Sequence, residues 1–231
     1  VRRLPLWHFD LDAARRNLAR QFETLDLAGF GAADLGAAVA AAGALLEYAK
    51  ATQGTGIAHV KALAVEQESA FVRMDPATRR NLEISETIRG EPAPTLLALM
   101  DTCATGMGSR LLYHSLHHPL RDRAILQARL AAVTALIGDS GKGPYRALHT
   151  LLRQCADVER ITARIALKSA RPRDLSGLRE TLKRLPELNA VLAAVLTPRL
   201  AALAAALAPQ DDLVTLLDAA IKPEPATVLR E

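Results

Sequence analysis

Aromatic residues are scarce in this chain of 231 residues, where they make up only 3% of the sequence. Half of the residues are hydrophobic nonetheless, and most of that apolar mass is alanine and leucine, which favour helices. A β-sandwich or β-barrel needs many aromatic and β-branched residues, so the composition excludes an all-β fold. Charged residues account for 23%, which is typical of a folded globular protein and argues against disorder.

Cysteines and long apolar runs are also few. Cys103 and Cys155 are too few for a disulfide framework, so we expect reduced thiols and a cytoplasmic location. The most apolar stretch, residues 188–208, is interrupted by polar residues and a proline, and no run approaches the roughly 20 apolar residues of a spanning helix. The first residues contain no secretory apolar region. We therefore predict no membrane segment.

Charge is nearly balanced, with 29 basic and 25 acidic residues and a net charge of +4. Composition changes near residue 75. Residues 1–75 hold six of the eight aromatic residues and carry eight basic and nine acidic side chains, whereas the rest of the chain is basic. We infer two regions: residues 1–74 as a small α/β segment, and residues 75–231 as an all-helical domain.

In the first region the pattern predicts helices at about 10–24 and 34–51 and strands at 4–9, 58–66 and 70–74. Asp10 or Asp12 caps the first helix, whose buried stripe is Leu11, Leu18 and Phe22. The buried stripe of the second helix is Leu35, Val39, Ala42, Leu45, Leu46 and Ala49.

Prolines divide the second region into helices of ordinary length. The expected helices are 76–88, 95–103, 107–117, 122–137, 144–154, 157–169, 172–185, 186–196, 198–208 and 211–221. Asp75-Pro76 begins the first of them as a cap followed by proline at the first helical position.

Sequence motifs for metal binding, phosphate binding or nucleophilic catalysis are incomplete in this chain. His114, His117 and His118 have a spacing that can present imidazoles to a metal, but no further ligand has a diagnostic spacing, which favours a polar helix end. Residues 138–143, GDSGKG, have too few residues between the glycines for a phosphate-binding loop, so we interpret them as a flexible interhelical loop. Neither cysteine and no serine lies in a nucleophile motif. We predict no enzyme activity and no bound cofactor or metal.

The densest basic cluster is Arg171, Arg173, Arg179, Lys183 and Arg184. It could contact a few phosphates in a weak, salt-dependent way. Acidic neighbours and the lack of a stacking aromatic favour ion pairs within the chain instead.

Four blocks of sequence, taken together, resemble the MutS family of DNA mismatch-repair proteins. They are PLWHFD at 5–10 with LDLAGFG at 25–31, MDPATRRNLEI at 74–84, TGMGSRLL at 105–112 with HPLRD at 118–122, and DVERI at 157–161 with ARPRDL at 170–175. Their order and separation match the family across nearly the whole chain.

The resemblance implies that residues 1–74 are the rear of an RNase H-like connector domain and that residues 75–231 begin the helical core, or lever, domain. It also implies that the mismatch-reading domain precedes this segment, and that the DNA clamp and the ATPase domain, with its ATP and Mg²⁺, follow it. The expected role is a rigid link between the nucleotide site and the elements that hold mismatched duplex DNA. None of the family's catalytic or base-contacting motifs is matched here.

The connector of the family is associated with docking a MutL-type partner, and our candidate for an exposed partner face is Arg15, Arg16, Asn17 and Arg20. Leu213, Leu216, Leu217 and Ile221 form an apolar stripe that we expect to be uncovered, which favours self-association. Two alternatives remain open: a free-standing helical adaptor or scaffold protein, and a weak nucleic-acid-binding module.

Overall fold

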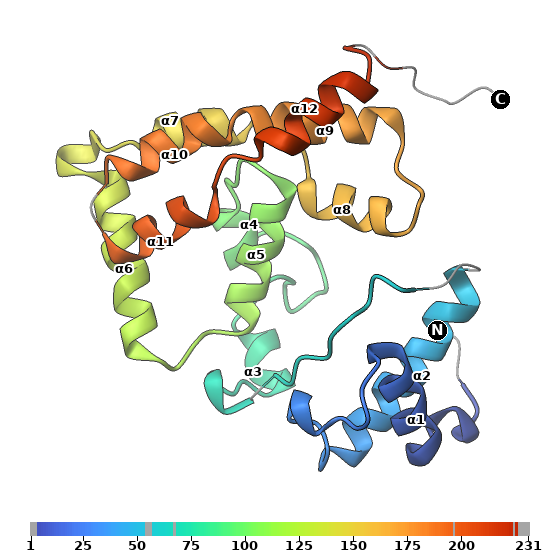
Figure 1. The fold of residues 1–231 in the computed structure, drawn as a ribbon. Helices are drawn as coiled ribbons and strands as arrows, with labels where there is room; N and C mark the ends of the chain where they lie inside the picture. Colours follow the sequence, from blue (N-terminus) through green and yellow to red (C-terminus); the bar gives the residue numbers. More distant parts are fainter. Residues whose placement is uncertain (1–3, 54–56, 67, 196, 224, 226–231) are drawn as a thin grey trace. The chain divides into compact units, whose positions relative to one another are not determined.

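The computed structural model describes residues 4–53, 57–66, 68–195, 197–223 and 225, and helices dominate them (Figure 1). The chain divides into two compact units. Residues 1–67 with 166–169 form the first unit, and residues 68–165 with 170–231 form the second. The prediction of a mainly helical fold is confirmed.

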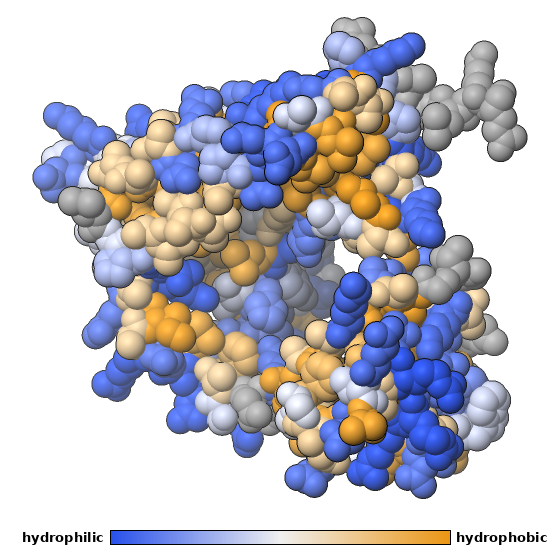
Figure 2. Space-filling view, viewed as in Figure 1, coloured by the Kyte–Doolittle hydropathy of each residue, from blue (hydrophilic) through white to orange (hydrophobic). Residues whose placement is uncertain are grey.

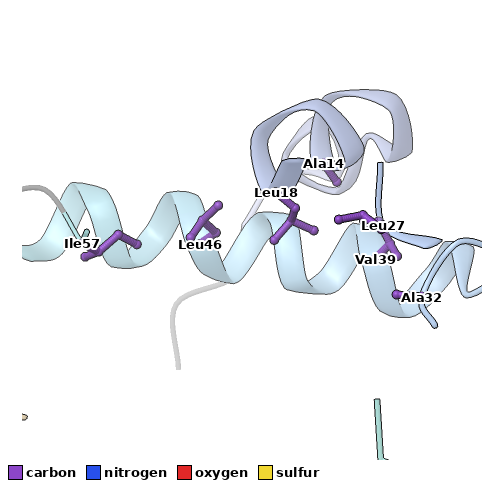
Figure 3. Packing of buried hydrophobic residues seen from close by; sticks show 7 residues of the cluster. All are labelled: Ala14, Leu18, Leu27, Ala32, Val39, Leu46 and Ile57. Carbon is purple, nitrogen blue, oxygen red and sulfur yellow. The ribbon is translucent and has the colours of Figure 1, made fainter. Parts of the chain in front are cut away.

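The first unit is built on two packed helices, α1 (Leu11–Phe22) and α2 (Gly36–Gln53). The side chain of Asp10 caps α1 by accepting a hydrogen bond of 2.7 Å from the backbone nitrogen of Ala13. The buried core around these helices is shown in Figure 3 and consists of Ala14, Leu18, Leu27, Ala32, Val39, Leu46 and Ile57. Leu45, predicted to lie on the buried stripe of α2, is instead 67% exposed.

The strands predicted before residue 75 are not formed within the described residues. Leu6–Phe9 is a 3-10 helix, residues 57–66 have no regular secondary structure, and Phe71 makes only an isolated antiparallel bridge with Leu120. A strand needs a neighbouring strand to pair its backbone groups. Here the Gln21 side chain of α1 donates instead to the carbonyls of Ile57 and Val60, both at 3.0 Å.

The second unit holds the ten predicted helices in the predicted order. They are α3 (Pro76–Asn81), α4 (Leu96–Met100), α5 (Gly106–His117), α6 (Arg123–Ile137), α7 (Tyr145–Leu152), α8 (Val158–Ala166), α9 (Pro172–Lys183), α10 (Leu185–Ala193), α11 (Pro198–Ala206) and α12 (Asp211–Ala220). Most starts agree closely with the prediction because local caps determine them: the side chains of Asp75, Thr105 and Asp122 each accept a backbone N–H of the first turn.

The first of these helices is shorter than predicted, ending at Asn81 instead of continuing to residue 88. Glu83 has a left-handed φ of 46°, and its carboxylate accepts a 2.8 Å hydrogen bond from the nitrogen of Ile88. The backbone nitrogen of Leu97 then donates to the carbonyl of Ile84 at 2.8 Å, so the segment folds back on itself as a loop.

Two hydrophobic clusters hold the second unit together. The larger joins α6, α7, α10 and α11 through Ala132, Leu148, Leu188, Leu192, Leu200 and Ala204. The smaller joins α8, α9 and α12 through Ile161, Leu178 and Leu217, and Figure 1 shows α9 and α12 side by side. Close-packed helices of this kind transmit displacement because few voids absorb it.

Two of the four residues in the apolar stripe predicted at 213–221 pack against the smaller cluster, and the other two are exposed. Leu217 is buried and Ile221 packs against it in the smaller cluster, so the prediction of exposure is wrong for these two residues. Leu213 and Leu216 are 38% and 62% exposed. Figure 2 shows apolar surface over α12 and along α6.

The segment Pro198–Ala220 is apolar and long enough to be considered for a membrane crossing by length and composition. The structure breaks it at residues 207–210, which include Pro209, into α11 and α12 of nine and ten residues. Each helix is about half the roughly 20 residues that a span needs, and α12 begins with Asp211 and Asp212. The break therefore argues against one continuous span.

Candidate functional site

A cluster of charged side chains joins α5 to the start of α8. The guanidinium of Arg110 donates to both carboxylate oxygens of Asp157, at 3.0 and 2.8 Å. It also donates to Oε2 of Glu159, at 3.0 Å from Nε and 2.6 Å from Nη2. Arginine presents its donors in a planar fork, so this two-carboxylate arrangement fixes the direction of the side chain.

Local sequence places both partners of this ion-paired junction. Thr105 caps α5 by accepting from the nitrogen of Gly108 at 3.0 Å, which brings Arg110 one turn into the helix. Asp157 accepts from the nitrogen of Arg160 at 3.1 Å and so caps α8 with an oxygen that also binds Arg110. A Cβ added to Gly106 would lie 3.4 Å from Oδ2 of Asp157, so the first residue of α5 lies directly beside this carboxylate.

The junction is electrostatically self-consistent. Its hydrogen bonds to Asp157 and then to Glu159 raise the pKa of Arg110 above its ordinary value. The same contact with Arg110 lowers the pKa of the Asp157 carboxyl. Both groups therefore stay ionised at neutral pH, where an unpaired charge in this partly buried place would be unfavourable.

The loop before α5 adds two further connections. The hydroxyl of Ser109 donates to Asp101 at 2.9 Å, and Nε2 of His149 on α7 lies 3.1 Å from the carbonyl oxygen of Thr102. Burial raises the pKa of the Cys103 and Cys155 thiols, which disfavours the nucleophilic thiolate. The ion-paired junction connects α5 to α8, and its charged groups bind one another.

Comparison with known families divides the chain into two matches. Residues 1–62 match MutS domain II, and residues 77–231, well over half of the chain, match MutS domain III. The chain belongs to the MutS family. Domain II is the connector and domain III the core of these mismatch-repair proteins, as the four sequence blocks suggested, and the ion-paired junction joins two of those blocks.

Sequence reasoning on this MutS segment missed Arg110, Asp157 and Glu159 as a functional set. Arg110 and Asp157 are 47 residues apart, and no local periodicity relates them. The available signal was weak: an arginine in the TGMGSRLL block and two acidic residues in the DVERI block.

Some of the basic residues predicted to contact phosphate form ion pairs and hydrogen bonds within the protein, and others are exposed. Arg179 is only 5% exposed, and it contacts Glu180 at 2.9 Å and donates to the carbonyl of Ile221 at 2.9 Å. Lys183 pairs with Asp218 of α12 at 2.7 Å. These two cations thus tie α9 to α12.

Of the remaining three candidates, one forms hydrogen bonds through its side chain and two are exposed. Arg184 donates to the carbonyl of Glu180 at 2.6 Å and to the side chain of Gln154 at 3.1 Å. Arg171 and Arg173 are exposed at the start of α9, and within the described residues neither guanidinium forms a hydrogen bond or ion pair. The nearby carboxylate of Asp174 is engaged by Arg164 at 2.6 Å.

The candidate partner face on α1 is placed on more than one side of the helix. Arg15, Arg16 and Arg20 are exposed, and Nη2 of Arg15 donates to the carbonyl of Ala33 at 3.2 Å. Arg15 and Arg16 line a groove of about 430 Å³, whereas Asn17 lines another, about 380 Å³, with Trp7. Arg15 and Arg16 therefore share one groove, Asn17 belongs to another, and Arg20 is exposed without lining either of them.

The three histidines at the end of α5 contact other side chains of the second unit. Nε2 of His117 lies 2.9 Å from the hydroxyl of Ser85, and the His118 ring stacks on His114 and meets Phe71 edge-on. In the described part of the chain, no group of three or more His, Cys, Asp or Glu side chains could hold a metal ion.

The loop at 138–143 is tighter than predicted. The nitrogen of Gly143 donates to the carbonyl of Ile137 at 2.7 Å, and Gly138 has φ +65°. A side chain at Gly143 would meet the backbone of Leu136 and Ile137. The segment is a hydrogen-bonded turn between α6 and α7, which agrees with an interhelical loop, and its flexibility stays a prediction.

Proposed function

We propose that this segment is the mechanical coupling element of a MutS-type mismatch-repair protein, linking nucleotide-driven changes to DNA clamping and mismatch recognition. The observation that carries the proposal is the ion-paired junction of Arg110 with Asp157 and Glu159. It connects two helices through four hydrogen bonds with defined directions, and such a contact passes on a displacement of one helix to the other.

The rest of the helical unit supports this role. The larger cluster packs four helices together, and the ion pairs of Arg179 and Lys183 tie α9 to α12. Packed interiors and interfaces switch between discrete arrangements instead of deforming continuously. A segment without its own reaction can thus control the timing of events at distant sites.

The decisive experiment replaces Arg110 by Gln in the family protein that carries this segment together with its ATPase domain. We expect ATP-dependent release from a mismatched duplex to slow by at least about tenfold, while nucleotide affinity stays within about twofold, because coupling and binding are separate free energies. Arg153→Gln, a change at the exposed residue that follows α7, is the matched control. Normal release by a folded Arg110→Gln protein contradicts the proposal.

For the 231-residue chain itself, we propose no ATP hydrolysis and no preference for mismatched over matched duplex. The two matched domains are the connector and the core, and it is only the family resemblance that implies binding of ATP with Mg²⁺ in a separate ATPase domain. Steady-state phosphate release and competition between two labelled duplexes measure these properties. Turnover above the buffer background, or tenfold discrimination between duplexes, refutes this assignment.

The arginine surface of α1 is our proposed docking place for a MutL-type partner. Arg16 and Arg20 are four residues apart on α1 and both are exposed, so an acidic partner surface can reach them together. Arg16→Glu with Arg20→Glu should weaken partner capture at least about tenfold, whereas Lys61→Glu, also exposed in this unit, should not. Equal capture by both variants excludes this surface.

Arg171 and Arg173 support a second candidate, a weak contact with duplex DNA. Both guanidinium groups are exposed and near the start of α9, where positive charge attracts phosphate without reading sequence. Fluorescence anisotropy across salt tests it: replacing both by Gln should reduce the salt slope by about two. An unchanged slope excludes the contact. Family membership gives no support to a free-standing adaptor.

A further inference from the structure

A cationic pocket of about 510 Å³ lies where residues 76–90 meet the end of α5. Three arginines line it, Arg79, Arg80 and Arg89, together with Glu86 as the one acidic lining residue. Two further acidic residues of this loop, Glu83 and Glu91, do not line the pocket, and the carboxylate of Glu83 is engaged by the nitrogen of Ile88 at 2.8 Å. The positive charge of the pocket therefore exceeds the negative charge in its lining.

Only one of the three arginines has a structural partner among the described residues. Arg80 donates from Nη2 to the carbonyl of Ile88 at 3.1 Å and so holds the loop. The Nε of Arg79 is buried without a hydrogen-bond partner, and Arg89 is exposed with no hydrogen bond or ion pair in the described chain. A buried donor without an acceptor is costly, since native structures satisfy most such groups with a protein partner or an ordered water.

Neutral donors complete the lining. Ser85 is held at 2.9 Å from Nε2 of His117, and Thr87 accepts from the nitrogen of Glu91 at 3.0 Å, which leaves the hydroxyl hydrogen of Thr87 available. Burial, followed by the charge of Arg79, lowers the pKa of His117. Of these two causes, only the charge of Arg79 reflects the positive field of the pocket.

We propose that this pocket binds a phosphate-type oxyanion through Arg79 and Arg89. Guanidinium forks match the paired oxygens of phosphate, and a tetrahedral anion can accept from Thr87 as well. The site is separate from the ion-paired junction and from Arg171 and Arg173, and the coupling role does not depend on it.

The test uses inorganic phosphate and the whole chain, with calorimetric titration against chloride at equal ionic strength. We expect Arg89→Gln to weaken phosphate binding about tenfold and Arg79→Gln with Arg89→Gln to abolish it, whereas Arg153→Gln changes it less than about twofold. Because Arg89 is exposed, its single replacement tests the site without a folding defect. Absent phosphate binding, or equal loss in the Arg153 control, overturns the proposal.

A second readout follows the His117 ring by proton NMR. Phosphate in the pocket should raise the pKa of His117, because a nearby anion stabilises the imidazolium, and Arg89→Gln should remove that rise. A pKa unaffected by saturating phosphate places the anion elsewhere and contradicts the proposal.

Two sources of the phosphate group can be separated. If the anion belongs to nucleic acid, a short duplex should compete with phosphate and lose affinity in Arg89→Gln. If it is a free phosphate, the duplex should not compete. Either result supports the site and identifies its source.

Discussion

The guanidinium of Arg179 is buried between α9 and α12, where it contacts two carboxylates. It lies 2.9 Å from Glu180 and 3.5 Å from Asp218, and it satisfies the carbonyl of Ile221. We predict that Arg179→Ala lowers the free energy of unfolding by about 1.5–3 kcal/mol, the range of hydrogen bonds to charged groups. Chemical denaturation with urea measures the change.

Arg173→Ala is the control for this prediction, since Arg173 is on the same helix and exposed. Surface changes of this kind stay within about 0.5 kcal/mol. A similar loss of stability in both variants contradicts the assignment of Arg179 as a structural residue.

His117 gives the protein a pH-dependent stability. Burial lowers its pKa in the folded state, with further contributions from Arg79 and His118. Between that lowered pKa and about 6.5, the unfolded chain binds a proton that the folded chain does not, so stability falls as pH decreases through this window. Thermal unfolding from pH 7.5 to 5 should show a decrease in Tm that is smaller in His117→Gln.

His59→Gln, which changes an exposed histidine in the other unit, should keep the pH dependence of the parent. If His117→Gln retains the full decrease in Tm, another group is responsible.

At the scale of elements, α1 and α2 approach so closely that one glycine determines their spacing. A Cβ added to Gly43 would lie 2.7 Å from the Cα of Ala14 and would also meet its side chain. Alanine is about 1 kcal/mol better than glycine inside a helix, yet Gly43→Ala should destabilise the unit by about 1–3 kcal/mol because the helices must separate. Urea unfolding of the chain checks the sign.

Gly36→Ala is a matched control on the same helix. Its added Cβ would make an ordinary contact of 3.5 Å with the Leu11 side chain. We expect no loss of stability there. A stabilising effect of Gly43→Ala would show that the two helices pack less closely than described.

The sequence predicted what local chemistry determines. The caps Asp10, Asp75 and Asp122 each act within three residues, and the helices begin where they indicate. The strands of the first region failed because a strand depends on a distant pairing partner, and Gln21 takes up two of the carbonyls concerned. The ion-paired junction was missed for the same reason, since its partners are far apart in sequence.

At the scale of the whole molecule, the two matched domains belong to one family, and the boundary between them stays a prediction. We placed it between residues 74 and 75, while the matches leave residues 63–76 unassigned and the compact units divide at residue 67. Limited proteolysis with mass spectrometry of the products can locate it. Cleavage confined to 63–76 agrees with a boundary in this interval, and a protease-resistant fragment that extends from before residue 63 to beyond residue 76 contradicts it.

Exposed apolar side chains predict that the chain self-associates. On α6, Leu126, Leu130, Val133 and Ile137 recur at helical spacing with exposures of 37–66%, and Leu216 of α12 is 62% exposed. A continuous apolar stripe of this kind tends to bury itself against a second copy. Light scattering over increasing concentration should show a rising mass, and Leu130→Lys with Val133→Lys should lower that mass towards the monomer.

Gln127→Lys, exposed on the same helix outside the stripe, adds the same type of charge and should leave association unchanged. A parent chain that stays monomeric at high concentration, or equal dissociation by the Gln127 control, contradicts a role for this face.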